Sequence, residues 1–233
     1  MLQTGNVAPS PELVERAGLI YRRLLDTFGL PAWDAFDTPL EELVSTILSQ
    51  NTNDRNRDLA YTNLRRRFTT WEEVRDADAE QVIEAIRQAG LANQKGPRIQ
   101  AVLREITEER GALDLDFLRQ LTPAEAHAWL MHFNGVGPKT AAIVMLFALG
   151  KPAFPVDTHI YRVTGRLGLR PPNMTVEQTH QWMERIFPPE VYGPAHINLI
   201  RLGRSICHAR RPDCLVCPLK DVCDYYQNLR NNR

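Results

Sequence analysis

All cysteines of this chain lie close together near its C-terminal end. Cys207, Cys214, Cys217 and Cys223 have the spacing C-x6-C-x2-C-x5-C, and no cysteine precedes them. A disulfide framework is not expected in a helical protein of this size. Four thiolates on one loop predict a metal site, and their spacing fits either tetrahedral zinc or a [4Fe-4S] cluster. A structural role is the plainer expectation, since the loop has few apolar residues of its own.

A second chemical feature is the lysine in the segment NGVGPKTAAIVMLF. Gly135 and Gly137 permit backbone angles that other residues avoid, and they let a ligand approach Val136 and the main chain closely. Pro138 suits the first position of a helix, and the apolar run that follows predicts a core helix of about ten residues. Lys139 lies at the start of this helix, where burial and the helix dipole favour its neutral, nucleophilic amine. Backbone N–H groups at such a turn also suit a phosphate.

Two further segments carry polar groups in informative places. Asp157, eighteen residues after Lys139, is predicted to cap the next helix, and its carboxylate is free to face a cleft as well. Arg210 and Arg211 lie between the first two cysteines. A metal would hold them in a basic ridge suited to phosphates, although an ordinary solvated charge run is the alternative.

The elements that position these residues are predicted to be helices throughout. Capping patterns recur along the chain, and alternating strand patterns do not, so we predict an all-α protein of about ten helices. Gly90, Gly111 and Gly150 are predicted helix stops. The predicted N-terminal caps are Ser10 before Pro11, Thr52 or Asn53, and the capping boxes of Thr38 with Glu41, Thr70 with Glu73, Thr122 with Glu125 and Thr175 with Gln178.

Composition limits the possible functions. Of 233 residues, 28 are basic and 28 acidic, so the net charge is zero and any nucleic acid must meet a local basic patch. The N-terminus lacks the order of a signal peptide, and no segment suits a membrane span. We therefore expect a soluble, monomeric, cytoplasmic protein, associated with the nucleoid if it binds DNA.

In combination, LMHFNGVGPKTAAIV, FPVDTHIYRV and the cysteine loop resemble the endonuclease III family of DNA repair glycosylases, in the helix-hairpin-helix-GPD superfamily. The resemblance runs from about residue 12 to Cys223, and it favours [4Fe-4S] over zinc. It implies base excision repair of damaged double-stranded DNA, with removal of oxidised pyrimidines and cleavage of the strand by β-elimination. It also implies a six-helix barrel over 31–151, with a cluster domain built from 1–30 and 152–233 and a cleft between the two domains.

The resemblance assigns roles to individual residues. Lys139 matches the lysine that forms a Schiff base with the sugar, and Asp157 the aspartate that favours the cationic transition state. Gln50 matches the side chain that fills the gap left by the flipped base, and Leu91 the wedge on the partner strand. The role of His159 is left open. The DNA-binding set also contains Gly135, Val136, Gly137, Arg210 and Arg211, and the metal ligands are Cys207, Cys214, Cys217 and Cys223.

Several positions depart from the family pattern. Phe133-Asn134 replaces a common Leu-Pro, Pro138 a frequent basic residue, and Ala92 a larger side chain. These changes leave every catalytic group in place but bear on activity and lesion choice. The alternatives are a mismatch-type glycosylase of the same superfamily, against which Ser45 and Lys139 argue, and a catalytically weak DNA-binding paralogue.

Overall fold

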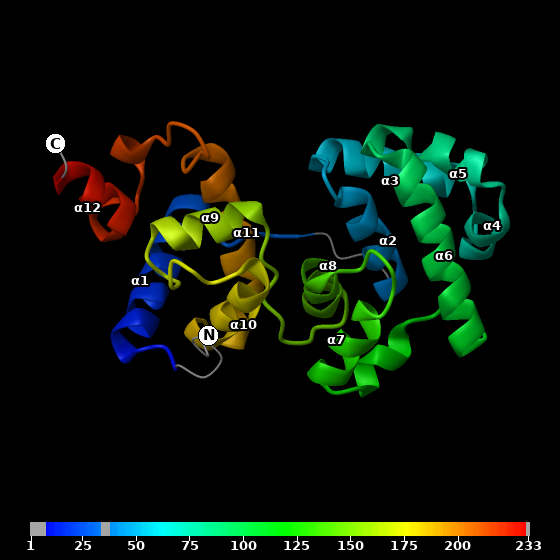
Figure 1. Cartoon of the computed structure of the whole chain (residues 1–233), viewed down its shortest axis with the longest axis horizontal. Helices are drawn as coiled ribbons and strands as arrows, with labels where there is room; N and C mark the ends of the chain where they lie inside the picture. The colour runs from blue at the N-terminus through cyan, green and yellow to red at the C-terminus, as the bar shows by residue number, and fades with distance from the viewer. Residues whose placement is uncertain (1–7, 34–37, 232–233) are drawn as a thin grey trace. The chain divides into compact units, whose positions relative to one another are not determined.

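The computed structural model describes residues 8–33 and 38–231, and every regular element in these ranges is a helix (Figure 1). The all-α prediction is confirmed. The chain divides into two compact units. Asp34–Lys151 forms one, here called the continuous unit, and Met1–Trp33 with Pro152–Arg233 forms the other, here called the split unit. None of the described helices combines the length and hydropathy that a bilayer span requires.

The continuous unit is built around α2, most of whose residues are buried. Leu43, Ile47 and Leu48 are fully enclosed, and α2 packs against α3, α6, α8 and η4. Its described elements are α2 (Pro39–Ser49), α3 (Asp54–Arg67), α4 (Trp71–Asp76), α5 (Ala79–Ala85), η2 (Arg87–Ala89), α6 (Ala92–Arg110), η3 (Asp116–Gln120), α7 (Pro123–Met131), α8 (Pro138–Ile143) and η4 (Val144–Ala148).

The split unit packs its first helix against its late helices. α1 contacts α11, and α9 also lies against α11, where Gly203 allows a close approach. A Cβ atom on Gly203 would lie 2.9 Å from that of His159. The described elements are α1 (Pro11–Phe28), α9 (Thr158–Arg166), α10 (Val176–Ile186), η5 (Pro189–Val191), α11 (Tyr192–Ser205), η6 (Cys214–Val216), η7 (Lys220–Val222) and α12 (Asp224–Asn231).

The helices begin where local capping chemistry predicts. Thr38, Thr70, Thr122 and Thr175 all form the expected capping boxes. Ser10 caps α1, and Asn53 rather than Thr52 caps α3 by accepting from the Asn56 N–H. Each cap satisfies backbone N–H groups that the helix itself leaves unpaired. The start of each of these helices is therefore fixed by three or four neighbouring residues.

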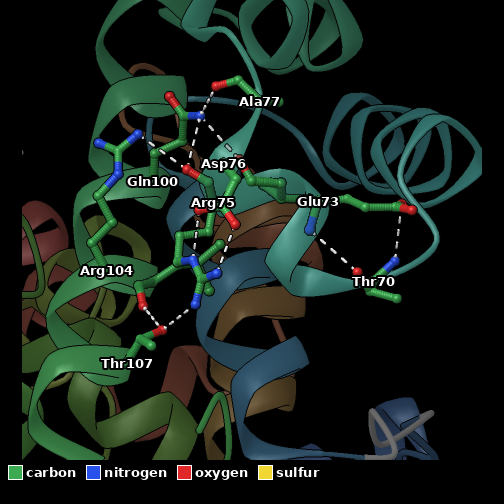
Figure 2. A network of polar contacts seen from close by, with 10 residues as sticks. Thr70, Glu73, Arg75, Asp76, Ala77, Gln100, Arg104 and Thr107 are labelled. Carbon is green, nitrogen blue, oxygen red and sulfur yellow. Dashed lines mark hydrogen bonds and ion pairs between the residues drawn. The ribbon is translucent and has the colours of Figure 1, made fainter. Parts of the chain in front are cut away.

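A polar network in the continuous unit fixes α4 against α6 (Figure 2). The buried amide of Gln100 donates to the carbonyl oxygens of Val74 and Ala77, at 3.0 and 2.7 Å. Arg75 donates to the hydroxyl of Thr107 at 3.0 Å, and Thr107 lies further along α6 than Gln100 does. The bonds from Gln100 satisfy carbonyl groups at the end of the short helix α4, which its own backbone cannot pair.

Candidate functional site

α7, the turn after it and α8 form a helix-hairpin-helix. The turn closes through the Val136 N–H, which donates to the Phe133 carbonyl at 3.1 Å. Gly135 has φ +84°, a left-handed conformation that favours glycine. The same expectation for Gly137 is wrong, because its φ of −94° is open to any residue. No atom lies within 4 Å of where a Gly137 Cβ would be, so its backbone remains open to close approach.

Lys139 is the second residue of α8 and is half-buried. The apolar run after it is helical as predicted, but the expected single regular helix is wrong beyond Ile143. From Val144 the run widens into the π-helix η4, in which the Leu149 N–H donates to the Val144 carbonyl. A uniformly apolar run has no signal that distinguishes the two helix types, and both α8 and η4 pack against α2. Such π turns are frequent at functional sites.

Gln50 ends α2 and reaches the hairpin turn. Its amide nitrogen donates to the Gly135 carbonyl at 3.0 Å, and its amide oxygen accepts from the Arg98 guanidinium at 2.9 Å. The Arg98 side chain lies directly against Gly135, and a Cβ added to this glycine would be only 2.1 Å from the Arg98 Nε. Both ends of the Gln50 amide are thus engaged within the protein. These two hydrogen bonds connect the end of α2 to the hairpin turn and to α6.

Left-handed backbone marks the segments expected to touch DNA. Among the described non-glycine residues, positive φ occurs at Asn51, Leu91 and Arg211, with values of 53°, 51° and 50°. Leu91 is 48% exposed, so it projects from the chain rather than packing as a helix-end contact. Residues held in such conformations cost energy and cluster at functional sites. Asn51 escaped the sequence analysis; its only signal there was an asparagine directly after the helix, a residue tolerant of this conformation.

In the split unit, Asp157 caps α9 as predicted. Its carboxylate accepts from the Ile160 N–H at 2.7 Å, and the side chain is half-buried. His159, in the first turn, places Nδ1 at 3.1 Å from the Arg162 guanidinium. Arg162 also donates to the carbonyl oxygens of Gly203 and Cys207, at 2.9 and 3.1 Å. The helix that begins at Asp157 is therefore bound directly to the start of the cysteine loop.

The four cysteines line one pocket with the apolar side chains of Val163, Leu202 and Ile206, and none forms a disulfide. Burial raises the pKa of Cys217 to about 11, so metal binding there must release a proton. Four cysteine thiolates around a common pocket are the ligand set that a [4Fe-4S] cluster requires.

Arg210 and Arg211 are both exposed on the loop between the first two cysteines. Arg166, from the end of α9, holds this loop by donating to the carbonyl oxygens of His208 and Ala209, at 2.6 and 3.0 Å. It also lies 3.4 Å from the Cys207 sulfur. Two arginines that face solvent on a loop fixed in this way suit contact with a polyanion.

Comparison with known proteins identifies the family to which the hairpin and the cysteine loop belong. Residues 44–189 match the HhH-GPD superfamily of base excision DNA repair proteins, and residues 207–223 match the iron-sulfur binding domain of endonuclease III. Endonuclease III of Thermotoga maritima is 34% identical over 189 residues, which cover 81% of this chain and 84% of that protein. Endonuclease III of Sulfolobus acidocaldarius is 33% identical over 192 residues, with 81% and 83% covered.

The solved structure of a non-covalent endonuclease III–DNA complex is similar, with a TM-score of 0.81, 26% identity, and coverage of 94% of this chain and 98% of that one. A thermostable thymine-DNA glycosylase, at 22% identity and a TM-score of 0.76, shares the fold. The cysteine loop expected to hold [4Fe-4S] is the segment that matches the iron-sulfur domain. The chain therefore belongs to the endonuclease III family of HhH-GPD base excision repair proteins, which are DNA glycosylase/AP lyase enzymes with a [4Fe-4S] cluster.

Proposed function

We propose that this protein acts as a monomer on duplex DNA, removes oxidised pyrimidines and cleaves the resulting abasic site through Lys139. The observation that carries the proposal is the position of Lys139 two residues after Gly137 of the hairpin, in a chain of this family. The continuous unit would be the hairpin-bearing domain, and the split unit the cluster domain. Lys139 would then belong to the hairpin-bearing domain, and Asp157 to the cluster domain.

The position of Lys139 supports the choice of nucleophile. Of the four lysines in the chain, Lys139 is the one that directly follows the turn proposed to contact DNA.

The proposed chemistry has two stages. The Lys139 amine attacks the anomeric carbon, the glycosidic bond breaks, and the bond electrons leave with the base, which takes up a proton. The carboxylate of Asp157 favours the positive charge that develops on the sugar. The C1′–O4′ bond then breaks, O4′ takes up a proton as the sugar ring opens, and the nitrogen forms a Schiff base with C1′. This Schiff base loses a proton from C2′, and the C3′–oxygen bond breaks to nick the strand. The amine is released when water hydrolyses the imine.

Other residues would hold the DNA. We propose that the Gly135–Gly137 turn contacts the backbone, that the Gln50–Asn51 turn fills the gap left by the extruded base, and that Leu91 enters from the partner strand. Arg210 and Arg211 would add phosphate contacts. Cys207, Cys214, Cys217 and Cys223 would ligate the cluster, which supplies structural order to the loop that carries these arginines.

Borohydride trapping tests the proposal. Wild-type protein is expected to cross-link to duplex DNA that contains an abasic site or an oxidised pyrimidine, because borohydride reduces the Schiff base to a stable amine. Lys139→Ala should bind the same DNA without cross-linking. Lys220→Ala, which removes an exposed lysine elsewhere, is the matched control and should cross-link normally. A wild-type protein that binds this DNA without cross-linking would refute the lyase assignment, and excision from mismatched pairs alone would refute the substrate class.

A further inference from the structure

Lys95 is a buried lysine that the proposed chemistry does not use. It is the fourth residue of α6, and its side chain is 1% exposed. Its amine donates to the carbonyl oxygens of Leu48 and Ala89, at 2.7 and 2.8 Å. A lysine buried to this degree ordinarily pairs with a carboxylate. Here both acceptors are main-chain groups from two other segments.

The two acceptors are ends of helical segments. Leu48 belongs to the last turn of α2, and Ala89 is the last residue of η2. Carbonyl groups at such ends have no partner within their own helix and need a hydrogen-bond donor from elsewhere. The Lys95 N–H also donates to the Leu91 carbonyl at 3.0 Å. One residue thus joins the end of α2, the end of η2 and the start of α6.

Both segments continue directly into strained turns. Asn51, three residues after Leu48, has φ +53°, and Leu91, two residues after Ala89, has φ +51°. Left-handed backbone at a leucine is unusual and persists only where the surroundings fix it. Lys95 holds the carbonyl group that precedes each turn. The two turns proposed to enter the DNA are therefore each preceded by a carbonyl group that is hydrogen-bonded to Lys95.

We propose that Lys95 is a positioning residue that fixes the separation of the Gln50–Asn51 turn and the Leu91 turn, so that the two enter the duplex as one unit. The inference rests on the proposed function, which assigns both turns to the DNA. It goes beyond that function by naming what sets their spacing. At Gly96, the residue after Lys95, α6 also approaches α5 closely, since an added Cβ would lie 3.0 Å from the Ile83 side chain.

A matched control is available on the same helix. Gln100 is also buried, at 2% exposed, and also donates only to main-chain carbonyl groups, those of Val74, Arg75 and Ala77 (Figure 2). These groups lie at α4, not at either proposed DNA turn. Lys95→Met and Gln100→Met both replace a buried polar side chain by an unbranched apolar one. A purely structural role for Lys95 predicts the same behaviour in the two variants.

The test compares full-length wild type, Lys95→Met and Gln100→Met, each with its cluster, on duplexes that carry an oxidised pyrimidine beside 2-aminopurine. Fluorescence of 2-aminopurine reports loss of stacking as the turns enter. We expect Lys95→Met to slow this step and single-turnover excision by about tenfold, the effect of one strong buried hydrogen bond, with little change in affinity for undamaged DNA. Amide hydrogen exchange should accelerate at residues 49–53 and 90–92 in Lys95→Met only.

The outcomes separate the two proposals. A wild-type protein without any lesion-dependent fluorescence change would overturn the proposed function and this inference together. A normal wild-type response that Lys95→Met leaves intact would overturn the inference alone. Equal slowing and equal exchange in Gln100→Met would also overturn it, because the effect would then follow from general loss of stability in the continuous unit.

Discussion

Burial and the charge of Arg98 lower the pKa of Lys95 from 10.5 to about 8 in the folded protein. Between these values the unfolded chain binds more protons than the folded one, so the contribution of Lys95 to stability rises with pH across this window. The neutral amine has two N–H groups for the two carbonyl acceptors, which explains how the site tolerates loss of the proton. The hydrogen bonds from Lys95 to Leu48 and Ala89 therefore do not require a charged amine.

This titration gives a measurable pH dependence. Urea denaturation from pH 7.5 to 10.5 should show the free energy of unfolding of wild type rising relative to that of Lys95→Met, by at most about 3 kcal/mol. Gln100→Met, which removes no titratable group, should keep a constant offset from wild type. A wild-type advantage that falls as the pH rises would contradict the assignment.

Individual residues differ in how far sequence alone could identify them. Lys139 and the four cysteines stand out because their neighbours in the chain define their chemistry. Lys95 does not, since a lysine near the start of a helix ordinarily lies on the surface, and only contacts with Leu48 and Ala89 reveal its position. Asn51 was missed because asparagine is common after a helix in ordinary conformations, and only the structure gives its φ of +53°.

At the scale of elements, the hairpin depends on a glycine in two ways. An alanine at position 135 would have to hold φ +84°, and its Cβ would lie 2.1 Å from the Arg98 side chain. The backbone conformation alone costs about 1 to 2 kcal/mol. Displacing Arg98 adds the loss of its bond to Gln50. Gly135 therefore supports both the turn and the side chains around it.

Gly111→Ala is the matched variant for Gly135→Ala. Gly111 ends α6 with φ +73°, and nothing lies within 4 Å of its added Cβ, so only the backbone cost applies. We expect Gly135→Ala to lower the free energy of unfolding by at least about 1 kcal/mol more than Gly111→Ala, through the lost hydrogen bond. It should also weaken DNA binding, measured by fluorescence anisotropy, whereas Gly111→Ala should not. Equal effects of the two variants would count against the hairpin contact.

Helix boundaries show what local sequence can determine. The predicted caps at Ser10, Thr38, Thr70, Thr122 and Thr175 are confirmed, because each depends on side chains within four residues. The change from α8 to the π-helix η4 was not predictable, because every residue from Ala141 to Ala148 is apolar and nothing in the run marks the boundary. Capping is a local property of the chain, and helix type within an apolar run is a tertiary one.

At the scale of the molecule, the cluster is expected to hold the loop that it occupies. Between Cys207 and Cys223 the described buried residues are Leu219 and Cys223, too few for a core. Oxidative loss of the cluster, followed by its visible absorbance, should therefore expose residues 207–223 to proteases while Asp34–Lys151 stays resistant. Protein with an intact cluster, digested in parallel, is the control. An unchanged cleavage pattern after cluster loss would show that the loop folds without it.

The split unit draws its first helix from the start of the chain and its remaining helices from the end. Arg16 donates to the Val222 carbonyl at 2.6 Å, and Arg23 to the Asp221 carboxylate at 2.9 Å, so α1 is fastened to the last turns of the cysteine loop. During synthesis, the continuous unit has all its residues before these partners of α1 exist. Cluster assembly must then wait until Cys223 has been synthesised, so iron enters the split unit only after every residue of the continuous unit has been made.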